Sequence, residues 1–297
     1  MATFALTTTT GIQQIDAILY GTIGILETAV PGRIKSYYLH GSFADGTGNA
    51  NSDIDLFIVA HGTFTAEERS KIQQLALSAS KFSAFFIEII ALNENIILQQ
   101  GHYRVKAASQ LIWGEDIRPQ LPEQSLEQYL QFYAHFPFTY LASMLRNSDS
   151  VTLPLDYPEA SGEFFGYDQQ LLPPENTPRH NIKKLVTGAC WSASVLLAWQ
   201  AGQFVPGKRA SVEMYRHAIN DEWAPFLEEL YEWGNRRWQY LVPVQAEERQ
   251  HLRALCTQAL AFENHYLQEY KKYLQEEQQQ SEKRKLDATQ RLQHIID

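Results

Sequence analysis

The chain has few cysteines and lacks a long uninterrupted apolar run. Its two cysteines, Cys190 and Cys256, are too few for a disulfide framework and lack the spacing of a metal site. The longest stretch without charge, residues 185–207, is interrupted by five threonine, serine and glutamine residues. A membrane span needs about 20 predominantly apolar residues, so this stretch predicts a buried helix followed by a loop. No basic and then apolar signal segment is visible, and we expect a cytoplasmic protein without a membrane partner.

Positive charge is also scarce. The sequence has 25 basic and 34 acidic residues, for a formal net charge of −9. Nucleic-acid binding usually requires a basic patch, so the composition makes nucleic acid an unlikely partner, although a small basic pocket for ATP remains compatible with it. An acidic surface suits a cationic small molecule, but it is also a common way to keep a protein in solution.

The first 120 residues show helix and strand patterns in alternation. Apolar residues at helical spacing predict a helix over residues 12–30, which Pro31 and Gly32 end. Strands are predicted over residues 34–40, 53–60 and 85–92, with helices after Ser42, over residues 65–81 and over residues 105–113. Thr65 and Glu68 are typical of a capped helix start. This order indicates a small α/β sheet.

After Pro122 the patterns become helical only. Helices are predicted over residues 124–146, 179–203, 211–220, 224–240 and 245–280, and residues 148–178 form a long irregular connection. The region 276–285 is interpreted as a polar helix or a frayed tail. At 297 residues the chain is long enough for two domains, and we place their boundary near residue 120, giving domains 1–120 and 121–297.

The most informative motif combines a Gly-Ser turn with two aspartates at the start of a strand. Gly41 and Ser42 follow the first strand, and Asp53 and Asp55 open the second. Residues i and i+2 of a strand point to the same face, so the two carboxylates would lie side by side, as Mg²⁺ sites require. Gly41 allows a close backbone approach, and a helix beginning after Ser42 would attract phosphates. An Asp-x-Asp alone is compatible with an ordinary turn and exposed acids.

The whole string from Gly41 to Leu56 resembles the signature of the DNA polymerase β-like nucleotidyltransferase superfamily. This resemblance implies a nucleotidyltransferase catalytic domain with a small mixed sheet in residues 1–120. A helical bundle in residues 121–297 would complete the nucleotide and acceptor sites. Asp53 and Asp55 would bind two Mg²⁺ ions. Glu88, in the third strand, would be the third catalytic carboxylate, as metal ligand or as general base. Its alternative is a strand residue that faces solvent.

Other residues are candidates for nucleotide binding. Ser42 would bind the β- or γ-phosphate, and Ser52 would either do the same or close an ordinary turn. The second half of the chain resembles the helical domain of streptomycin/spectinomycin-type aminoglycoside adenylyltransferases. This likeness implies that Lys208 reaches the triphosphate and that Tyr231 contacts the nucleotide. A solvated loop lysine and a core tyrosine are the alternatives. An arginine expected before Lys208 is missing, and Ser194 lies near its place.

The reaction expected from these residues is Mg²⁺-dependent transfer of AMP from ATP to a hydroxyl of a small molecule, such as an aminoglycoside-like antibiotic. The alternatives are AMPylation of a protein or nucleotidylation of RNA in a toxin–antitoxin-like setting, or a non-catalytic nucleotide-binding module. Acids of the long connection are interpreted either as ligands of a cationic acceptor or as an exposed flexible loop. They are Asp156, Glu159, Glu163 and Asp168. The sequence does not specify the oligomeric state.

Overall fold

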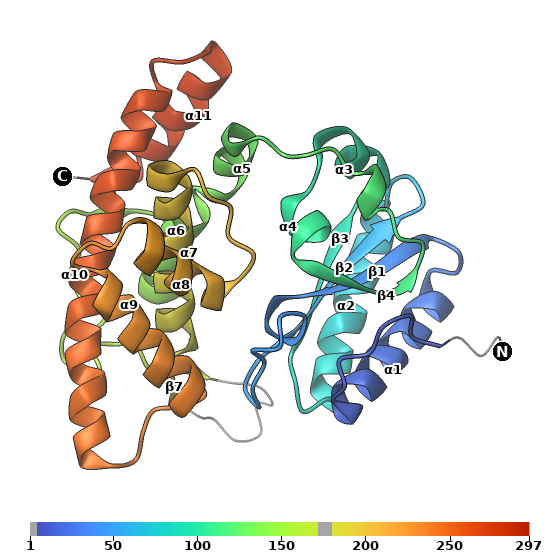
Figure 1. Cartoon of the computed structure of the whole chain (residues 1–297), viewed down its shortest axis with the longest axis horizontal. Helices are drawn as coiled ribbons and strands as arrows, with labels where there is room; N and C mark the ends of the chain where they lie inside the picture. Colours follow the sequence, from blue (N-terminus) through green and yellow to red (C-terminus); the bar gives the residue numbers. More distant parts are fainter. Residues whose placement is uncertain (1–4, 172–179, 297) are drawn as a thin grey trace. The chain divides into compact units, whose positions relative to one another are not determined.

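The computed structural model describes residues 5–171 and 180–296 of the chain. Within these ranges the chain forms two compact units, which meet in the sequence between Ser125 and Leu126. The first unit is an α/β domain and the second is mainly helical (Figure 1), which confirms the predicted fold class. No helix in the described ranges combines the length and the apolar character needed to cross a membrane.

The first unit is built on a mixed sheet of four strands in the order β3-β2-β1-β4. Strands β2 and β3 are parallel, whereas β1 is antiparallel to both of its neighbours. The elements in chain order are α1 (Gln13–Ala29), β1 (Ile34–His40), β2 (Ile54–Ala60), α2 (Ala66–Phe82), β3 (Ile87–Leu92), α3 (Glu94–Gln100), α4 (Tyr103–Ala107) and β4 (Ser109–Gly114).

The sheet has an apolar core on each face, and the alternation of β2 separates them. Ile54, Leu56 and Ile58 are fully buried in the core that also contains residues of α1 and α2. Phe57 and Val59 belong to the smaller core with residues of α3 and α4. Because side chains alternate along a strand, Asp55 shares the face of Phe57. This face holds the candidate site.

Helix α2 begins with the capping box that the sequence predicts. The Thr65 hydroxyl accepts a hydrogen bond from the Glu68 backbone N–H at 3.1 Å, and the Glu68 carboxylate accepts one from the Thr65 N–H at 2.7 Å. The Arg33 guanidinium, 2.5 Å from Glu68, lowers the pKa of that carboxyl to about 2, and the bond from the Thr65 backbone adds to this shift. Glu68 therefore remains ionised and keeps capping the helix at neutral pH.

Thr65→Ala should lower the free energy of unfolding by about 1 kcal/mol, because loss of an N-cap hydroxyl leaves a helix N–H unsatisfied. Urea denaturation measures this change. Thr63→Ala is the matched control, since Thr63 is exposed just before the helix and should change stability by less than about 0.5 kcal/mol. Equal losses in both variants would contradict the capping role.

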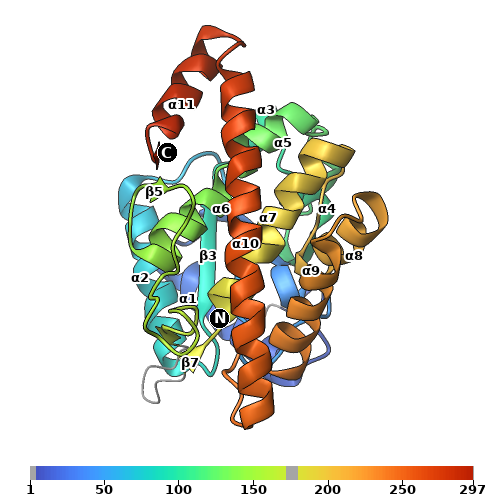
Figure 2. The ribbon, with the colours of Figure 1, turned by 90° about the vertical axis from the view of Figure 1, so that its left-hand side faces the viewer.

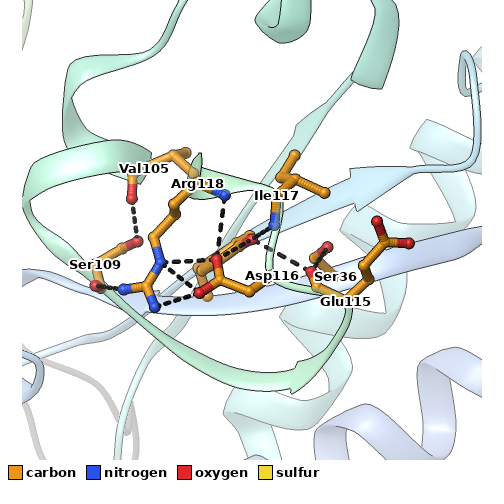
Figure 3. A network of polar contacts seen from close by, with 8 residues as sticks. Ser36, Val105, Ser109, Glu115, Asp116, Ile117 and Arg118 are labelled. Atoms are coloured by element: carbon orange, nitrogen blue, oxygen red, sulfur yellow. Dashed lines mark hydrogen bonds and ion pairs between the residues drawn. The ribbon is translucent and has the colours of Figure 1, made fainter. Parts of the chain in front are cut away.

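The prediction of a helix over residues 105–113 is wrong from residue 108 onwards. Helix α4 ends at Ala107, and Ser109–Gly114 form the edge strand β4, which pairs with β1. The following segment is bonded to the start of this strand (Figure 3). The Arg118 guanidinium forms a two-point ion pair with Asp116, at 2.8 and 2.6 Å, and donates to the Ser109 carbonyl at 3.0 Å. The Arg118 guanidinium lowers the pKa of the Asp116 carboxyl. This pair secures the outer edge of the sheet.

The second unit consists mostly of helices. Its α-helices are α5 (Leu126–Tyr133), α6 (Phe136–Thr139), α7 (Lys183–Ala201), α8 (Lys208–Ala218), α9 (Ala224–Tyr231), α10 (Ala246–Glu277) and α11 (Glu282–Leu292). Two π-helical turns follow α6 and α9, at Tyr140–Met144 and Glu232–Arg237. The short strands are β5 (Val151–Thr152), β6 (Gln170–Leu171), β7 (His180–Asn181) and β8 (Ile295–Ile296).

Residues 276–296 pack on the rest of the second unit and do not form a frayed tail. Helix α11 folds back along α10 (Figure 2), and Arg284 forms ion pairs with the buried Glu277 of α10 and with Glu127 of α5, the latter at 2.8 Å. Strand β8 then pairs in parallel with β5, in the long connection between α6 and α7. These contacts are non-local, which explains why the polar composition of residues 276–285 left their structure undecided.

Candidate functional site

The predicted acids of the first unit lie at the same end of two neighbouring strands. Asp55 is the second residue of β2 and Glu88 the second residue of β3, and the two are directly paired in the parallel register. Directly paired residues point to the same face of a sheet. Asp53 lies immediately before β2, two residues from Asp55. Asp53 and Asp55 are half-buried, whereas Glu88 is exposed.

The Gly-Ser turn touches one of these carboxylates. His40, the last residue of β1, pairs with Asp55, so the turn that follows lies beside the acid. A Cβ atom added to Gly41 would lie 2.3 Å from Oδ2 of Asp55, and the φ of Gly41 is +70°. Any other residue would be strained at this backbone angle and would also displace the carboxylate. Position 41 therefore requires glycine for two independent reasons.

The expectation of a helix after Ser42 is wrong. Gly41–Phe43 form a single 3-10 turn, in which the Gly41 carbonyl accepts bonds from the Ala44 and Asp45 N–H groups at 3.1 Å. The loop then returns, and the Ser42 carbonyl accepts bonds from the N–H groups of residues 47 and 48 at 2.9 Å. One short turn does not carry the dipole of a long helix. Phosphate binding here would rely on the Ser42 hydroxyl and the first N–H groups of the turn.

Two further polar residues of this loop have structural partners. The Ser52 hydroxyl accepts a hydrogen bond from the Asn49 N–H at 2.9 Å, and Ser52 is only 3% exposed. Asp45 accepts a bond from the Thr47 N–H at 2.9 Å and so closes its own turn. Ser52 therefore closes a turn in the structure, as one of the two alternatives expects. A role of Ser52 in nucleotide binding stays a prediction.

His40 is a buried residue that is paired with Asp55 in the sheet. Its ring stacks on Phe57 with 3.8 Å between centroids, and within the described residues its buried Nε2 atom has no hydrogen-bond partner. Burial lowers the pKa of His40 well below the usual value, and the charges of Arg104 and His102 add to this. Burial likewise lowers the pKa of His102 to about 4. Both imidazoles are neutral at physiological pH and add no charge beside Asp55.

A preformed metal site is not seen. Among residues 5–171 and 180–296, no three histidine, cysteine, aspartate or glutamate side chains lie close enough to bind one metal ion together. Asp55 and Glu88 nevertheless share a face, and Gly41 leaves room for the Asp55 carboxylate. Carboxylate oxygens are the donors that Mg²⁺ prefers. The donor set therefore fits a hard divalent cation.

The candidate nucleotide residues of the second unit lie on two helices. Lys208 is the first residue of α8, and its Nζ atom lies 5.6 Å from the centre of the Tyr240 ring. Tyr231, the last residue of α9, is only 5% exposed, and the Arg236 guanidinium lies 5.8 Å from its ring centre. The burial of Tyr231 fits the alternative of a core tyrosine. Contact of Tyr231 with a nucleotide stays a prediction. Ser194 is buried in α7 and donates to the Cys190 carbonyl at 2.9 Å.

Glu163 and Asp168, two of the candidate acids of the long connection, lie beside basic side chains. Glu163 forms a two-point ion pair with Arg249, and Asp168 lies 3.8 Å from the Nδ1 atom of His180. Together with residues 241–244 these four side chains line a pocket of about 580 Å³. The charges in this pocket are mixed. Binding of a cationic acceptor by these acids stays a prediction.

Part of the chain matches the model of a known protein family. Residues 24–117 match the family model described as polymerase beta, nucleotidyltransferase. No curated protein sequence matches the chain. A solved structure of spectinomycin adenyltransferase AAD(9) from Enterococcus faecialis, with ATP and spectinomycin, is similar over 83% of this chain and 98% of its own, with 12% identity and a TM-score of 0.46. A toxin–antitoxin structure with AMP-PNP is similar over 41% of this chain and 91% of its own, with 21% identity and a TM-score of 0.26.

Residues 24–117 contain the last six residues of α1, the four strands of the sheet of the first unit and the Gly-Ser and Asp-x-Asp motifs. The first unit is therefore a nucleotidyltransferase domain of the polymerase β type. This assignment rests on the family model, and it confirms the resemblance derived from the motif.

Proposed function

We propose that the chain is a Mg²⁺-dependent adenylyltransferase that moves AMP from ATP to a hydroxyl of a small molecule. The observation that carries this proposal is the direct pairing of Asp55 with Glu88, with the Asp55 carboxylate against Gly41 of the Gly-Ser turn. Two acids and a glycine turn at one end of a sheet are the parts that nucleotidyl transfer needs, since this reaction depends on positioning and charge neutralisation.

Asp53 and Asp55 would bind the metal ions, of which two are expected, and Glu88 would either join them as a ligand or act as the general base. When bound, Mg²⁺ neutralises charge on the triphosphate and favours the deprotonated acceptor oxygen. The Ser42 hydroxyl and the N–H groups of its turn would bind the β- or γ-phosphate. Lys208 would contribute a positive charge to the same triphosphate.

In the proposed reaction the acceptor oxygen attacks the α-phosphorus of ATP. The bond between this phosphorus and the oxygen that bridges to the β-phosphate breaks, and pyrophosphate leaves with that electron pair. The hydroxyl proton passes to a carboxylate, for which Glu88 is the candidate because it is exposed beside Asp55. A general base must reach the proton that it removes, and an exposed side chain can adjust to the acceptor.

The test is pyrophosphate release from ATP and Mg²⁺ with a panel of acceptors. Aminoglycosides and aminocyclitols represent small hydroxyl compounds, and a mixture of proteins and a mixture of RNAs represent the alternatives. Release that depends on a small hydroxyl compound supports the proposal. Release only with the protein mixture or only with the RNA mixture would show that the acceptor is a protein or an RNA, respectively. Thermal stabilisation by ATP and Mg²⁺ without pyrophosphate from any acceptor would identify a binding module instead.

Gly41→Ala should reduce pyrophosphate release by about 100-fold, because the added methyl group displaces the Asp55 carboxylate and misplacement of about 1 Å costs this much. Gly62→Ala is the matched control. Gly62 also has a positive φ, +78°, but no atom lies within 4 Å of the added Cβ. Both variants should lose about 1–2 kcal/mol of stability from backbone strain. Equal activities in the two variants would contradict the role of the Gly41–Asp55 contact.

A further inference from the structure

Two lysines of the second unit lie at the same aromatic ring. The Nζ atom of Lys183, the first residue of α7, lies 5.8 Å from the centre of the Tyr240 ring, and Nζ of Lys208, the first residue of α8, lies 5.6 Å from it. The two lysines are 25 positions apart in the sequence. Tertiary structure alone brings them together, and we call Lys183, Lys208 and Tyr240 the two-lysine cluster.

The ring of this cluster is held rigidly. Tyr240 is fully buried, and its hydroxyl accepts a hydrogen bond from the side-chain amide of the buried Asn235. Its backbone carbonyl accepts a bond from the Ile182 N–H at 2.7 Å, directly before Lys183. The Lys183 N–H in turn donates to the side chain of the fully buried Asn181 at 3.0 Å. The base of the Lys183 side chain and the ring are therefore fixed to each other.

Lys208 is fixed by the start of its own helix. The Ser211 hydroxyl donates to the Lys208 carbonyl at 2.7 Å, and the Ser211 N–H donates to the Gly207 carbonyl at 2.9 Å. The Lys208 charge also acts on the buried Cys190 of α7, whose pKa is raised to about 11 by burial, an effect that this charge partly offsets. Helices α7 and α8 pack against each other, so the helix that Lys208 begins is a neighbour of the helix that Lys183 begins.

The chemistry of the cluster favours an anion. Each ammonium group is attracted to the ring face by about 0.5–1 kcal/mol, but two like charges near one ring repel each other. Both lysines stand at helix N-termini, where the helix dipoles add further positive potential. An anion bound between such groups gains from both lysines, and a polyphosphate, with several charges in a row, gains most.

We propose that Lys183 is a second triphosphate-binding residue, which acts together with Lys208 beside the Tyr240 ring. This inference rests on the proposed function and extends it. The resemblance to aminoglycoside adenylyltransferases leads one to expect an arginine on the helix before Lys208. Here the nearby Ser194 is buried and bonded to its own helix. Lys183, in the first turn of this same helix α7 and eleven positions before Ser194, provides a positive charge at a different place on the helix.

The experiment is a calorimetric titration of the full chain with tripolyphosphate and Mg²⁺. Lys183→Met and Lys208→Met should each weaken binding about tenfold, which corresponds to about 1.4 kcal/mol. Lys184→Met is the matched control: it removes the same charge one residue along, but Nζ of Lys184 donates to the Met144 carbonyl at 2.8 Å. Binding by this variant should stay within about twofold of the wild type. Binding by Lys183→Met that equals the wild type, or no binding of tripolyphosphate by the wild type, would overturn the inference.

Two additions keep the test independent of folding and of activity. Lys183→Arg should restore most of the binding, whereas a merely structural role of the lysine side chain would not depend on charge. In the wild type, tripolyphosphate should protect Lys183 and Lys208, but not Lys184, from acetylation, as measured by mass spectrometry. Equal protection of all three lysines would contradict the inference.

If pyrophosphate release fails with every acceptor, the proposed function fails while these binding results stand. If release is normal in Lys183→Met, the inference alone fails.

Discussion

Asp53→Asn should abolish pyrophosphate release while the chain stays folded. The substitution keeps the size of the side chain and removes the charge that the proposed metal site requires. Loss of one such electrostatic group typically costs about 10²–10³ in rate, and we expect a fall of at least about 10³-fold here. Asp53 is half-buried and precedes β2, so the free energy of unfolding should change by less than about 1 kcal/mol.

The matched control for this variant is Glu67→Gln, an exposed acid in the first turn of α2. It removes one negative charge from the same unit and should leave pyrophosphate release within about twofold of the wild type. Coupled phosphate detection measures the release, and a thermal melt checks the fold. Unchanged turnover in Asp53→Asn would end the enzyme model based on these acids.

Arg146→Met should lower the free energy of unfolding by about 3–5 kcal/mol, the cost of leaving a buried charge without its partner. The Arg146 guanidinium lies 2.6 Å from the Glu263 carboxylate, and their side chains are only 12% and 5% exposed. Burial raises the pKa of Glu263, and only the charge and hydrogen bonds of its neighbours Arg146 and Tyr167 offset this effect. Tyr167 donates to the same carboxylate at 3.0 Å, so the pair joins the long connection to α10.

A double-mutant cycle separates the charge from the packing. In Arg146→Met/Glu263→Gln the amide keeps an acceptor for Tyr167 but carries no charge, so at least about half of the lost stability should return. Lys272→Met, which breaks an exposed pair with Glu269, should cost less than about 1 kcal/mol. Urea denaturation at neutral pH measures Arg146→Met, Glu263→Gln, the double variant and Lys272→Met. Additive losses in the double variant would show that the buried charge is not the cause.

Elements in which apolar residues recur at regular spacing were predictable from the local sequence. The fully buried residues Ile15, Leu19 and Ile23 recur every four positions, and α1 follows them. The strand β1 was predicted over its full length. The edge strand β4 was missed because a short apolar run such as residues 111–113 fits a helix or a strand equally well. Its pairing with β1 decides between them, and this partner is about 70 residues away.

The candidate site was predictable in composition but not in contacts. The spacing of Asp53 and Asp55 and the position of Glu88 in an apolar strand are visible in the sequence. The register that pairs Glu88 with Asp55, and the contact between Asp55 and Gly41, depend on how separate segments meet. Lys183 had no sequence signal, because a lysine at the start of a helix is ordinarily a solvated residue. Only its distance to Tyr240 distinguishes it.

The central claim is that Asp53, Asp55 and Glu88 bind divalent ions beside the Gly-Ser turn. A crystal structure of the chain with Mn²⁺ and α,β-methylene ATP, in which a carbon atom replaces the oxygen that leaves with pyrophosphate, tests it most directly. We expect anomalous Mn²⁺ peaks in contact with Asp53 and Asp55, with the triphosphate against Ser42. Mn²⁺ and triphosphate bound away from these residues would contradict it.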